Sequence, residues 1–252
     1  MCSIVSWPTR TSRQEVVSVV ICALNEAESI GHVLDSLPED VDEVILVDGN
    51  STDGTIEVAL GHRPDLRVVS ERRLGKGAAM TSGFAAASGD IIITMDGDGS
   101  TDAAEIPRFI ETLRNGADLA KGSRFIEGGG SDDFTSVRRL GNRALCTVTN
   151  LLYGTRYSDL CYGFNAIWSR SLAAVRIDCS GFEVETLLSI RAAKSGLKVV
   201  EVPSFELPRR GGKSKLSPVR DGFRILRVIL AERVARTNGR TTTRTDGRAL
   251  PR

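Results

Sequence analysis

The sequence has no long hydrophobic run. Its best apolar stretch, Val16–Leu24, covers nine residues, whereas a helix that crosses a bilayer needs about 20. No basic segment followed by a long apolar stretch stands at the N-terminus, so we expect no secretory signal peptide. These absences predict a cytoplasmic protein that is not integral to a membrane, although it could still lie peripherally on the cytoplasmic membrane face.

Paired cysteines are missing as well. The five cysteines are widely scattered and form no C-x-x-C pair; they are Cys2, Cys22, Cys146, Cys161 and Cys179. An odd, dispersed set is typical of reduced thiols in the cytosol and not of a disulfide framework.

Two kinds of phosphate-binding loop are also absent. Gly75-Lys76-Gly77 lacks the full G-x-x-x-x-G-K-[ST] pattern, which argues against a P-loop ATPase. The G-x-G-[ST]-R type of loop, which would favour a nucleotidyltransferase, is missing too. Lys76 begins a predicted helix, where it suits an anion, although a plain helix-entry turn is an equally good interpretation.

Acidic residues are scarce in the C-terminal part of the chain, whereas the rest of the chain has a net negative charge. Residues 1–203 carry 20 Lys and Arg against 28 Asp and Glu, whereas residues 204–252 carry 13 against 4. The basic C-terminal part indicates a polyanionic partner such as lipid head groups, or else a solvated, disordered end. We expect no nucleic acid partner. The length of 252 residues and the 41% hydrophobic content fit one large domain.

Strands and helices alternate through the first half. The predicted strands are Val16–Ala23, Val41–Val47, Leu66–Val69, Asp90–Met95 and Ala117–Lys121, and the predicted helices are Glu26–Leu37, Thr52–Leu60, Lys76–Ser88 and Ala103–Asn115. This pattern predicts an α/β fold with a Rossmann-like single domain and a mainly parallel sheet. Ligands of such sheets bind beyond the carboxyl ends of the strands.

The second half is less regular. It contains predicted helices at Val137–Tyr153 and Glu183–Ser195, predicted strands at Tyr162–Trp168 and Lys198–Pro203, a flexible Gly-rich loop at Glu127–Asp133 and a basic loop at Ser204–Leu216. The chain therefore divides into a flexible leader at 1–15, a catalytic domain at 16–216, an amphipathic helix at 217–236 and a disordered tail at 237–252.

The C-terminal helix has one apolar stripe. Val219, Phe223, Leu226 and Leu230 recur at helical spacing, and arginines run beside them. Such a stripe suits either an anionic membrane surface or packing on the catalytic domain or a second subunit. The sequence leaves these alternatives open.

Two carboxylates follow the predicted strand at 90–95. Asp96 and Asp98 stand at i and i+2 in a glycine-flanked turn, where both can reach one hard cation. Mg²⁺ or Mn²⁺ prefers such oxygen ligands and completes its shell with phosphate oxygens. We therefore predict a metal site at this turn, with a solvated acidic turn as the alternative.

Another acidic loop follows the strand at 41–47. Asp48 is placed to accept hydrogen bonds from a ribose or a base, and we favour ligand contact for it. Asp53 stands just before the next helix, where Asp is a favoured capping residue, so a structural role is the better interpretation.

Several segments together resemble inverting glycosyltransferase family 2. They are VVICALNEAESI, EVILVDGNSTDGT, GKGAAM, GDIIITMDGDGS, AKGSRF, DLCYGFNA, GFEVET, EVP and RRGGKSKL, which span roughly residues 16–216. Within the family the chain looks most like polyprenyl- and dolichyl-phosphate mannose or glucose synthases. The resemblance implies a GT-A fold and a divalent-metal-dependent hexosyltransferase with one nucleotide-sugar site.

The resemblance also implies roles for individual residues. With Lys76, the nucleotide-sugar-binding candidates are Asn25, Glu26, Asp48, Asp96, Arg209, Ser214 and Lys215. The catalytic candidates are Asp98, Arg124, Glu183 and Glu185. Glu183 and Glu185 could instead be first-turn helix acids, and Arg209 and Lys215 could be solvated loop charges.

The donor and the acceptor remain open at this point. The chain reads Asp48-Gly49-Asn50-Ser51 where the lipid-phosphate synthases usually read D-D-G-S, and Ser100 stands where they usually have Gln. A donor of the GDP-mannose or UDP-glucose type is expected. The acceptor is either a polyprenyl phosphate, held by Arg124 and Arg138 or Arg139, or a hydroxyl of a sugar, peptide or natural product, which would need Glu183 or Glu185 as general base. A non-catalytic nucleotide-sugar-binding protein and a homodimer are further possibilities.

Overall fold

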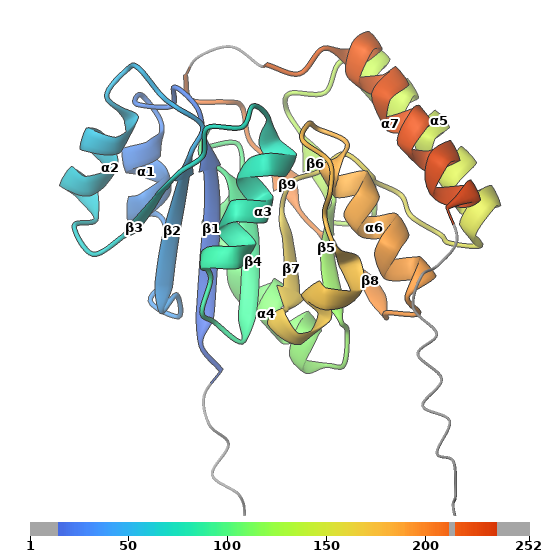
Figure 1. Ribbon diagram of the computed structural model, residues 1–252, viewed down its shortest axis with the longest axis horizontal. Helices are drawn as coiled ribbons and strands as arrows, with labels where there is room; N and C mark the ends of the chain where they lie inside the picture. The colour runs from blue at the N-terminus through green and yellow to red at the C-terminus, as the bar shows by residue number, and fades with distance from the viewer. Residues whose placement is uncertain (1–14, 212–214, 236–252) are drawn as a thin grey trace, which may run out of the picture.

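A seven-stranded sheet forms the centre of the computed structural model, which describes residues 15–211 and 215–235 (Figure 1). Its strand order is β3-β2-β1-β4-β7-β5-β8. The strands are β1 (Val17–Ala23), β2 (Glu43–Asp48), β3 (Arg67–Ser70), β4 (Ile91–Asp96), β5 (Leu119–Ser123), β7 (Asn165–Trp168) and β8 (Val199–Pro203). The predicted leader and tail, apart from Glu15, and Ser214 lie outside the described residues.

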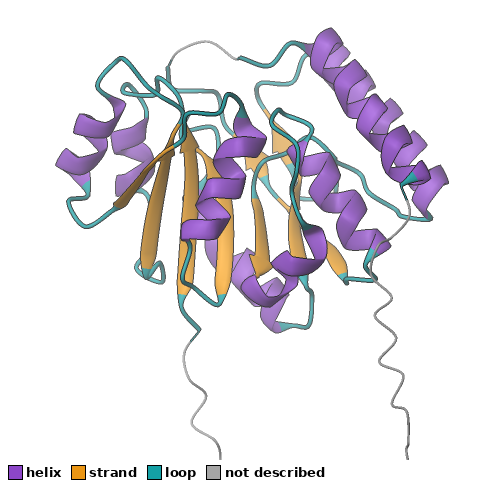
Figure 2. Ribbon diagram, in the orientation of Figure 1, coloured by secondary structure: helices purple, strands orange, loops and turns teal. Residues whose placement is uncertain are grey.

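Helices cover both faces of this sheet (Figure 2). They are α1 (Ile30–Asp35), α2 (Thr55–His62), α3 (Lys76–Ala86), α4 (Ile106–Arg114), α5 (Ser136–Tyr153), α6 (Val184–Lys194) and α7 (Pro218–Val234), with 3-10 turns η1 (Ala103–Glu105) and η2 (Ser169–Val175). The architecture is therefore the predicted α/β fold. No helix among the described residues is long and apolar enough to span a bilayer.

The parallel register brings the carboxyl ends of three strands to one edge. Cys22 of β1 lies opposite Asp96 of β4, and Ala23 lies opposite Asp48 of β2. Side chains in β1, β2 and β4 are almost all buried, because helices cover both faces of the sheet. The sheet thus fixes the two acidic loops on either side of the end of β1.

The sheet departs from a purely parallel arrangement at β7. This strand runs antiparallel to both β4 and β5. Two further short strands, β6 (Gly130–Ser131) and β9 (Phe205–Glu206), pair within segments that the sequence predicts as loops. Strands of two residues carry no periodic pattern, and their pairing depends on contacts between distant parts of the chain.

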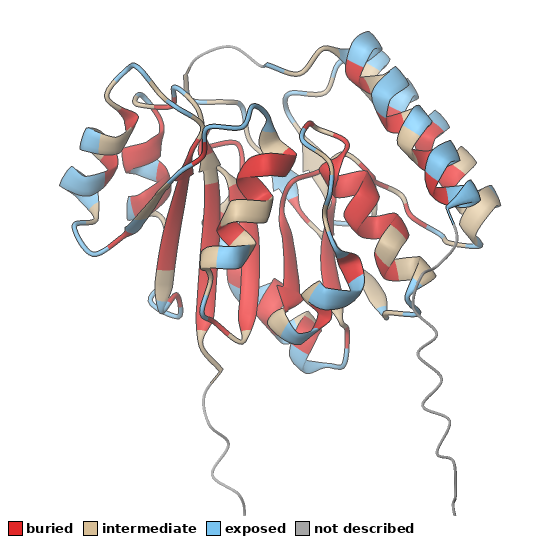
Figure 3. Cartoon of the chain, viewed as in Figure 1, coloured by how far each residue is buried: buried red, intermediate tan, exposed pale blue. Residues whose placement is uncertain are grey.

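Helices α5 and α7 lie side by side at the end of the sheet that carries β8 (Figure 1). Ile225 and Ile229 of α7 are buried in a cluster with Leu145 of α5. The predicted stripe is a different face: Val219 and Phe223 are 67% and 70% exposed, and Leu226 is half-buried against the same cluster. Helix α7 therefore packs against α5 and α6, while much of its outer face is exposed (Figure 3), including the apolar residues Val219 and Phe223.

Candidate active site

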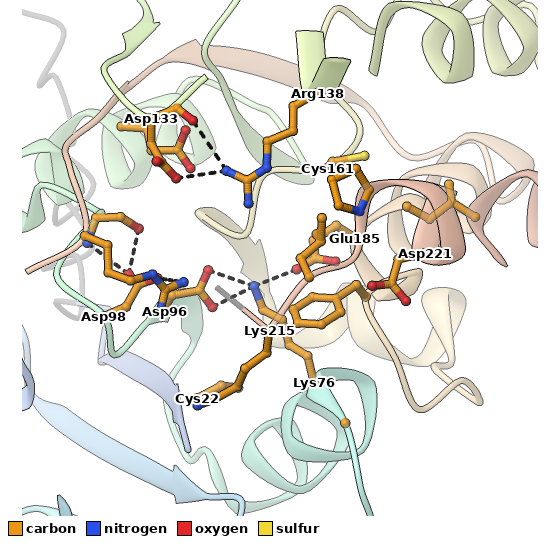
Figure 4. A pocket seen from close by; sticks show the side chains of 18 of the residues that line it. Cys22, Lys76, Asp96, Asp98, Asp133, Arg138, Cys161, Glu185, Lys215 and Asp221 are labelled. Atoms are coloured by element: carbon orange, nitrogen blue, oxygen red, sulfur yellow. Dashed lines mark hydrogen bonds and ion pairs between the residues drawn. The ribbon is translucent and has the colours of Figure 1, made fainter. Parts of the chain in front are cut away.

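A cavity of about 400 Å³ opens at the carboxyl ends of β1 and β4 (Figure 4). Its sheet end is formed by Glu26, Lys76, Asp96, Asp98 and Arg209. Its helical end lies between the first halves of α5 and α7 and is formed by Phe134, Val137, Arg138, Gly141, Leu145, Val219, Gly222 and Ile225. The position agrees with the expected site of ligands on such a sheet.

Asp96 and Asp98 each hold a cationic side chain at the sheet end. The Asp96 carboxylate lies 2.6 Å from Nζ of Lys76, and Oδ2 of Asp98 lies 2.6 Å from Nη2 of Arg209. Ser100 donates to Asp98 through its backbone N–H and its hydroxyl. Burial and the neighbouring Asp98 raise the pKa of Asp96 above its ordinary value, although Lys76 opposes the shift.

Lys76 joins this turn to the second half of the chain. Its Nζ is also 2.7 Å from Oε1 of Glu185, whose side chain is almost fully buried. Burial by itself would lower the pKa of Lys76, but the two carboxylates raise it above its ordinary value, so the ammonium group stays charged. Lys76 is thus a fixed positive charge at the floor of the pocket.

A second set of cations reaches the sheet end from the loop before α7. Glu26 lies 3.4 Å from Arg209 and 3.5 Å from Lys215, which also donates to the carbonyl oxygen of Leu24. Burial raises the pKa of Glu26, while Lys215 and Arg209 oppose the shift. Ser214, a predicted member of this loop, falls outside the described residues.

The carboxylate of Asp48 stabilises the loop after β2 through hydrogen bonds to the loop's backbone. Oδ2 of Asp48 accepts from the N–H groups of Asn50 and Ser51, while the buried Oδ1 has no hydrogen-bond partner among the described residues. Asn25 accepts from the N–H of Thr52 and so ties the loops after β1 and β2 together.

Asp53 links this loop to the loop after β1 and to the start of the next helix. It accepts from the N–H groups of Ala27 and of Thr55, where α2 begins. These hydrogen bonds confirm a structural role for Asp53, although the N-cap of α2 is Gly54 and not Asp53. Asp48 is different, because its buried Oδ1 has no hydrogen-bond partner among the described residues, although Asp48 itself is outside the residues that line the cavity.

The glycosyl transferase family 2 model matches residues 18–176. The chain belongs to glycosyltransferase family 2. It is 30% identical to undecaprenyl-phosphate mannosyltransferase from Micrococcus luteus over 215 residues, which cover 80% of this chain and 87% of the relative. It is 29% identical to dolichyl-phosphate hexose transferase from Haloferax volcanii, over 86% of this chain and 96% of the relative.

Solved structures agree with the family. Glucosyl-3-phosphoglycerate synthase from Mycobacterium tuberculosis, in complex with Mn²⁺, UDP-glucose and phosphoglyceric acid, superposes with a TM-score of 0.71 at 26% identity, over 89% of this chain and 82% of that chain. The resemblance to a GT-A glycosyltransferase inferred from the sequence is therefore confirmed. The family 2 chain is a sugar transferase.

Asp96 and Asp98 fit a metal only together with a substrate. No group of three or more metal-ligating side chains gathers among the described residues. Mg²⁺, however, commonly uses one or two carboxylates plus phosphate oxygens. Seven carboxylates and five cationic side chains line the described part of the pocket, so a divalent cation arriving with an anionic ligand meets a surplus of negative charge. Asp96 and Asp98 are therefore two carboxylates of the kind that such a site uses.

Arg124 of this family 2 chain lies in a buried ion network. Its guanidinium donates to both oxygens of Asp159 and to Glu206, and its side chain is 8% exposed. The guanidinium also lies over the aromatic rings of Phe134 and Tyr162, with each ring centroid within 5 Å of the guanidinium carbon. Arg124 lines the pocket, but most of its hydrogen-bonding capacity is directed into the protein.

The two predicted acids at the start of α6 have different positions: Glu183 is the N-cap and Glu185 lies in the first turn. Glu185 lines the pocket and binds Lys76. Glu183 is outside the residues that line it, accepts from the N–H of Gly181 and lies 3.7 Å from Arg224 of α7. Only Glu185 is placed to influence a bound ligand directly.

Sequence reasoning missed most of the helical end. Asp133 lies 2.8 Å from Arg138 across the mouth of the cavity, next to Phe134. The wall beyond them is apolar and comes from α5 and α7, two helices that are distant in the sequence. The signal that could have identified it is the apolar spacing of Val137 and Leu145, which would place them on one face of α5.

Cysteine chemistry plays no part at the pocket wall. Burial raises the pKa of Cys22 and of Cys161 to about 12, so both thiols stay protonated at neutral pH. Since the thiolate is the nucleophilic form, neither residue is suited to form a covalent intermediate.

Proposed function

We propose that this family 2 enzyme transfers a hexose from a nucleoside diphosphate sugar to a polyprenyl phosphate, in a single displacement with inversion. The observation that carries the choice of acceptor concerns the carboxylates. Each one that lines the described part of the pocket already has a cation or a hydrogen-bond donor beside it: Glu26, Asp96, Asp98, Asp133, Glu185, Glu206 and Asp221.

A hydroxyl acceptor needs a base, whereas a phosphate acceptor does not. A general base must take the proton of a hydroxyl as it attacks. Glu185 is neutralised by Lys76, and Glu183 lies outside the cavity lining. A phosphate monoester is already anionic, so the arrangement of charges favours it over a hydroxyl.

The donor would bind at the sheet end. Asp48 would accept a hydrogen bond from the nucleoside through Oδ1, and Asp96 and Asp98 would hold a Mg²⁺ or Mn²⁺ ion. Such an ion supplies positive charge to the leaving diphosphate. Arg209 and Lys215 would move their hydrogen bonds from Glu26 and Asp98 to diphosphate oxygens, while Lys76 stays in place between Asp96 and Glu185.

The acceptor would approach from the helical end, close to a membrane. Two relatives support this choice by their names, which are undecaprenyl-phosphate mannosyltransferase and dolichyl-phosphate hexose transferase. Arg138 would bind the acceptor phosphate after leaving Asp133. The exposed apolar side chains of α5 and α7 beside the same opening suit a bilayer surface, where the phosphate of a polyprenyl lipid lies.

A panel of donors and acceptors tests the proposal. Purified protein with Mn²⁺ or Mg²⁺ would be incubated with GDP-mannose, UDP-glucose and related donors, and with undecaprenyl phosphate or with free sugars and peptides. We expect a lipid-linked hexose of inverted anomeric configuration from one donor. Transfer to hydroxyl acceptors only, or retention of configuration, would contradict the proposal.

A further inference from the structure

Two glycines occupy unusual places in the helices of the helical end. Gly141 lies inside α5 and Gly222 inside α7, where a glycine costs about 1 kcal/mol relative to alanine. Both line the cavity. A Cβ atom built on either residue would meet no atom within 4 Å. Neither glycine is therefore explained by close packing.

The two glycines of α3, in contrast, do have a packing reason. A Cβ on Gly77 of α3 would lie 2.5 Å from the carbonyl oxygen of Cys179, and one on Gly83 would collide with Val20 of β1. These residues let α3 approach its neighbours closely. Gly141 and Gly222 instead leave open space beside the pocket.

Both glycines are the middle members of apolar rows. On α5, Gly141 lies between Val137 and Leu145 at spacings of four residues, and on α7, Gly222 lies between Val219 and Ile225 at spacings of three. All six residues line the cavity. The space at the glycines is thus a slot with apolar walls on both helices.

The slot has a closed end and an open end. Leu145 and Ile225 are buried together where the two helices pack. Val137 and Val219 are 64% and 67% exposed at the other end. Phe134, just before α5, and Arg138, in its first turn, line the same cavity as the sheet-end residues.

We propose that this slot receives the first isoprene units of the acceptor lipid, with Gly141 and Gly222 providing the room. The inference rests on the proposed function, since it takes the acceptor to be a prenyl phosphate. The occupant follows from chemistry: the slot has apolar walls, and it belongs to the same cavity as Arg124 and Arg138, whose positive charge suits a phosphate. The glycines set which chain fits beside the reacting phosphate.

Filling the slot tests the idea. Gly141→Leu and Gly222→Leu would be compared with wild type on five-, ten- and twenty-carbon prenyl phosphates in detergent. Wild type should show a KM that falls with chain length until the slot is filled. Each variant should raise KM for the twenty-carbon acceptor by about tenfold or more, because several buried methylenes are displaced. The increase in KM should be smaller for the five-carbon acceptor, which has fewer methylenes to displace, and KM for the nucleotide sugar should change less than about twofold.

Gly61→Leu is the matched control. Gly61 lies in α2, is exposed, and also has open space at its Cβ position, but it lies outside the cavity lining. All three substitutions should keep or raise Tm, because leucine favours helix. The control should leave the chain-length dependence unchanged.

Two outcomes overturn the inference in distinguishable ways. If the Gly141→Leu and Gly222→Leu proteins fold and keep the wild-type chain-length dependence, the slot does not bind the lipid, but the proposed function is unaffected. If the wild-type protein glycosylates no prenyl phosphate of any length, both the slot and the proposed function are contradicted.

Discussion

The sheet end and the helical end of the pocket are built from different kinds of structure. The sheet end consists of loops that follow β1, β2 and β4, whose register fixes Asp48 and Asp96 relative to each other. The helical end is assembled from α5, α7 and a buried ion network between segments distant in sequence. Under the proposed function, the charged sheet end would bind the polar donor and the more apolar helical end would bind the acceptor.

The largest effect should appear when the ion network of the helical end is broken. Asp159 is fully buried and lies 2.7 Å from Nε of Arg124. We expect Asp159→Asn to lower the free energy of unfolding by about 3–5 kcal/mol, because a buried cation loses its main partner. Denaturant unfolding at pH 7 measures the change.

An exposed pair in the same region provides the control. Asp133 is 47% exposed in its pair with Arg138, so Asp133→Asn should cost less than about 1 kcal/mol. The Asp159 effect should also depend on pH. Burial would raise the pKa of Asp159, but Arg124 and Lys121 hold it below 3.8, so its stabilisation is present above pH 3.8 and is lost as pH falls through the folded-state pKa. Equal costs for the two variants would contradict the buried-network account.

The sheet end could be predicted from the sequence far better than the helical end. Alternating strands and helices with acidic turns directly after strands are local patterns, and they placed Asp48, Asp96 and Asp98 at one edge. The antiparallel β7 and the β6–β9 pair depend on contacts between distant segments, which single-sequence patterns do not encode. The same reason explains why Arg124 was predicted near the acceptor or leaving group and its partners Asp159 and Glu206 were not.

The second largest effect concerns catalysis at the sheet end. Asp98→Asn keeps the shape of the side chain but removes the charge that faces Arg209. If Asp98 holds the metal, the transfer rate should fall by about 100- to 1,000-fold, while Tm stays near that of wild type. Asp102→Asn, in the same loop and capping η1, is the control and should keep its activity. Near-normal turnover by Asp98→Asn at saturating Mn²⁺ would argue against the metal assignment.

A smaller effect is expected for nucleotide binding. In Asp48→Asn, one side-chain oxygen can still accept from the N–H groups of Asn50 and Ser51, so the loop should hold its shape. Loss of the charged acceptor should weaken nucleoside diphosphate binding by about 1.5–3 kcal/mol. Calorimetric titration with GDP and UDP would measure it. Unchanged affinity for both nucleotides would mean that Asp48 only shapes the loop.

The smallest effect should come from single arginines on the outer face of the helical end. Arg220 and Arg227 are exposed on α7, near Phe223, which is 70% exposed. If this face rests on anionic lipid, Arg220→Gln or Arg227→Gln should each weaken vesicle binding by about 1 kcal/mol, or roughly fivefold. Because surface electrostatics are screened by salt, the difference should shrink between low and physiological ionic strength.

Co-sedimentation with vesicles containing phosphatidylglycerol would measure this effect, and the expected pattern separates charge from apolar contact. Phe223→Ser should weaken binding at every salt concentration, because it removes buried apolar area rather than charge. Arg108→Gln on α4, far from α7 (Figure 1), should change nothing. Substitutions on α7 that leave vesicle binding equal to that of the α4 control would show that the helical end faces a soluble partner, and the acceptor would then have to reach the slot from solution.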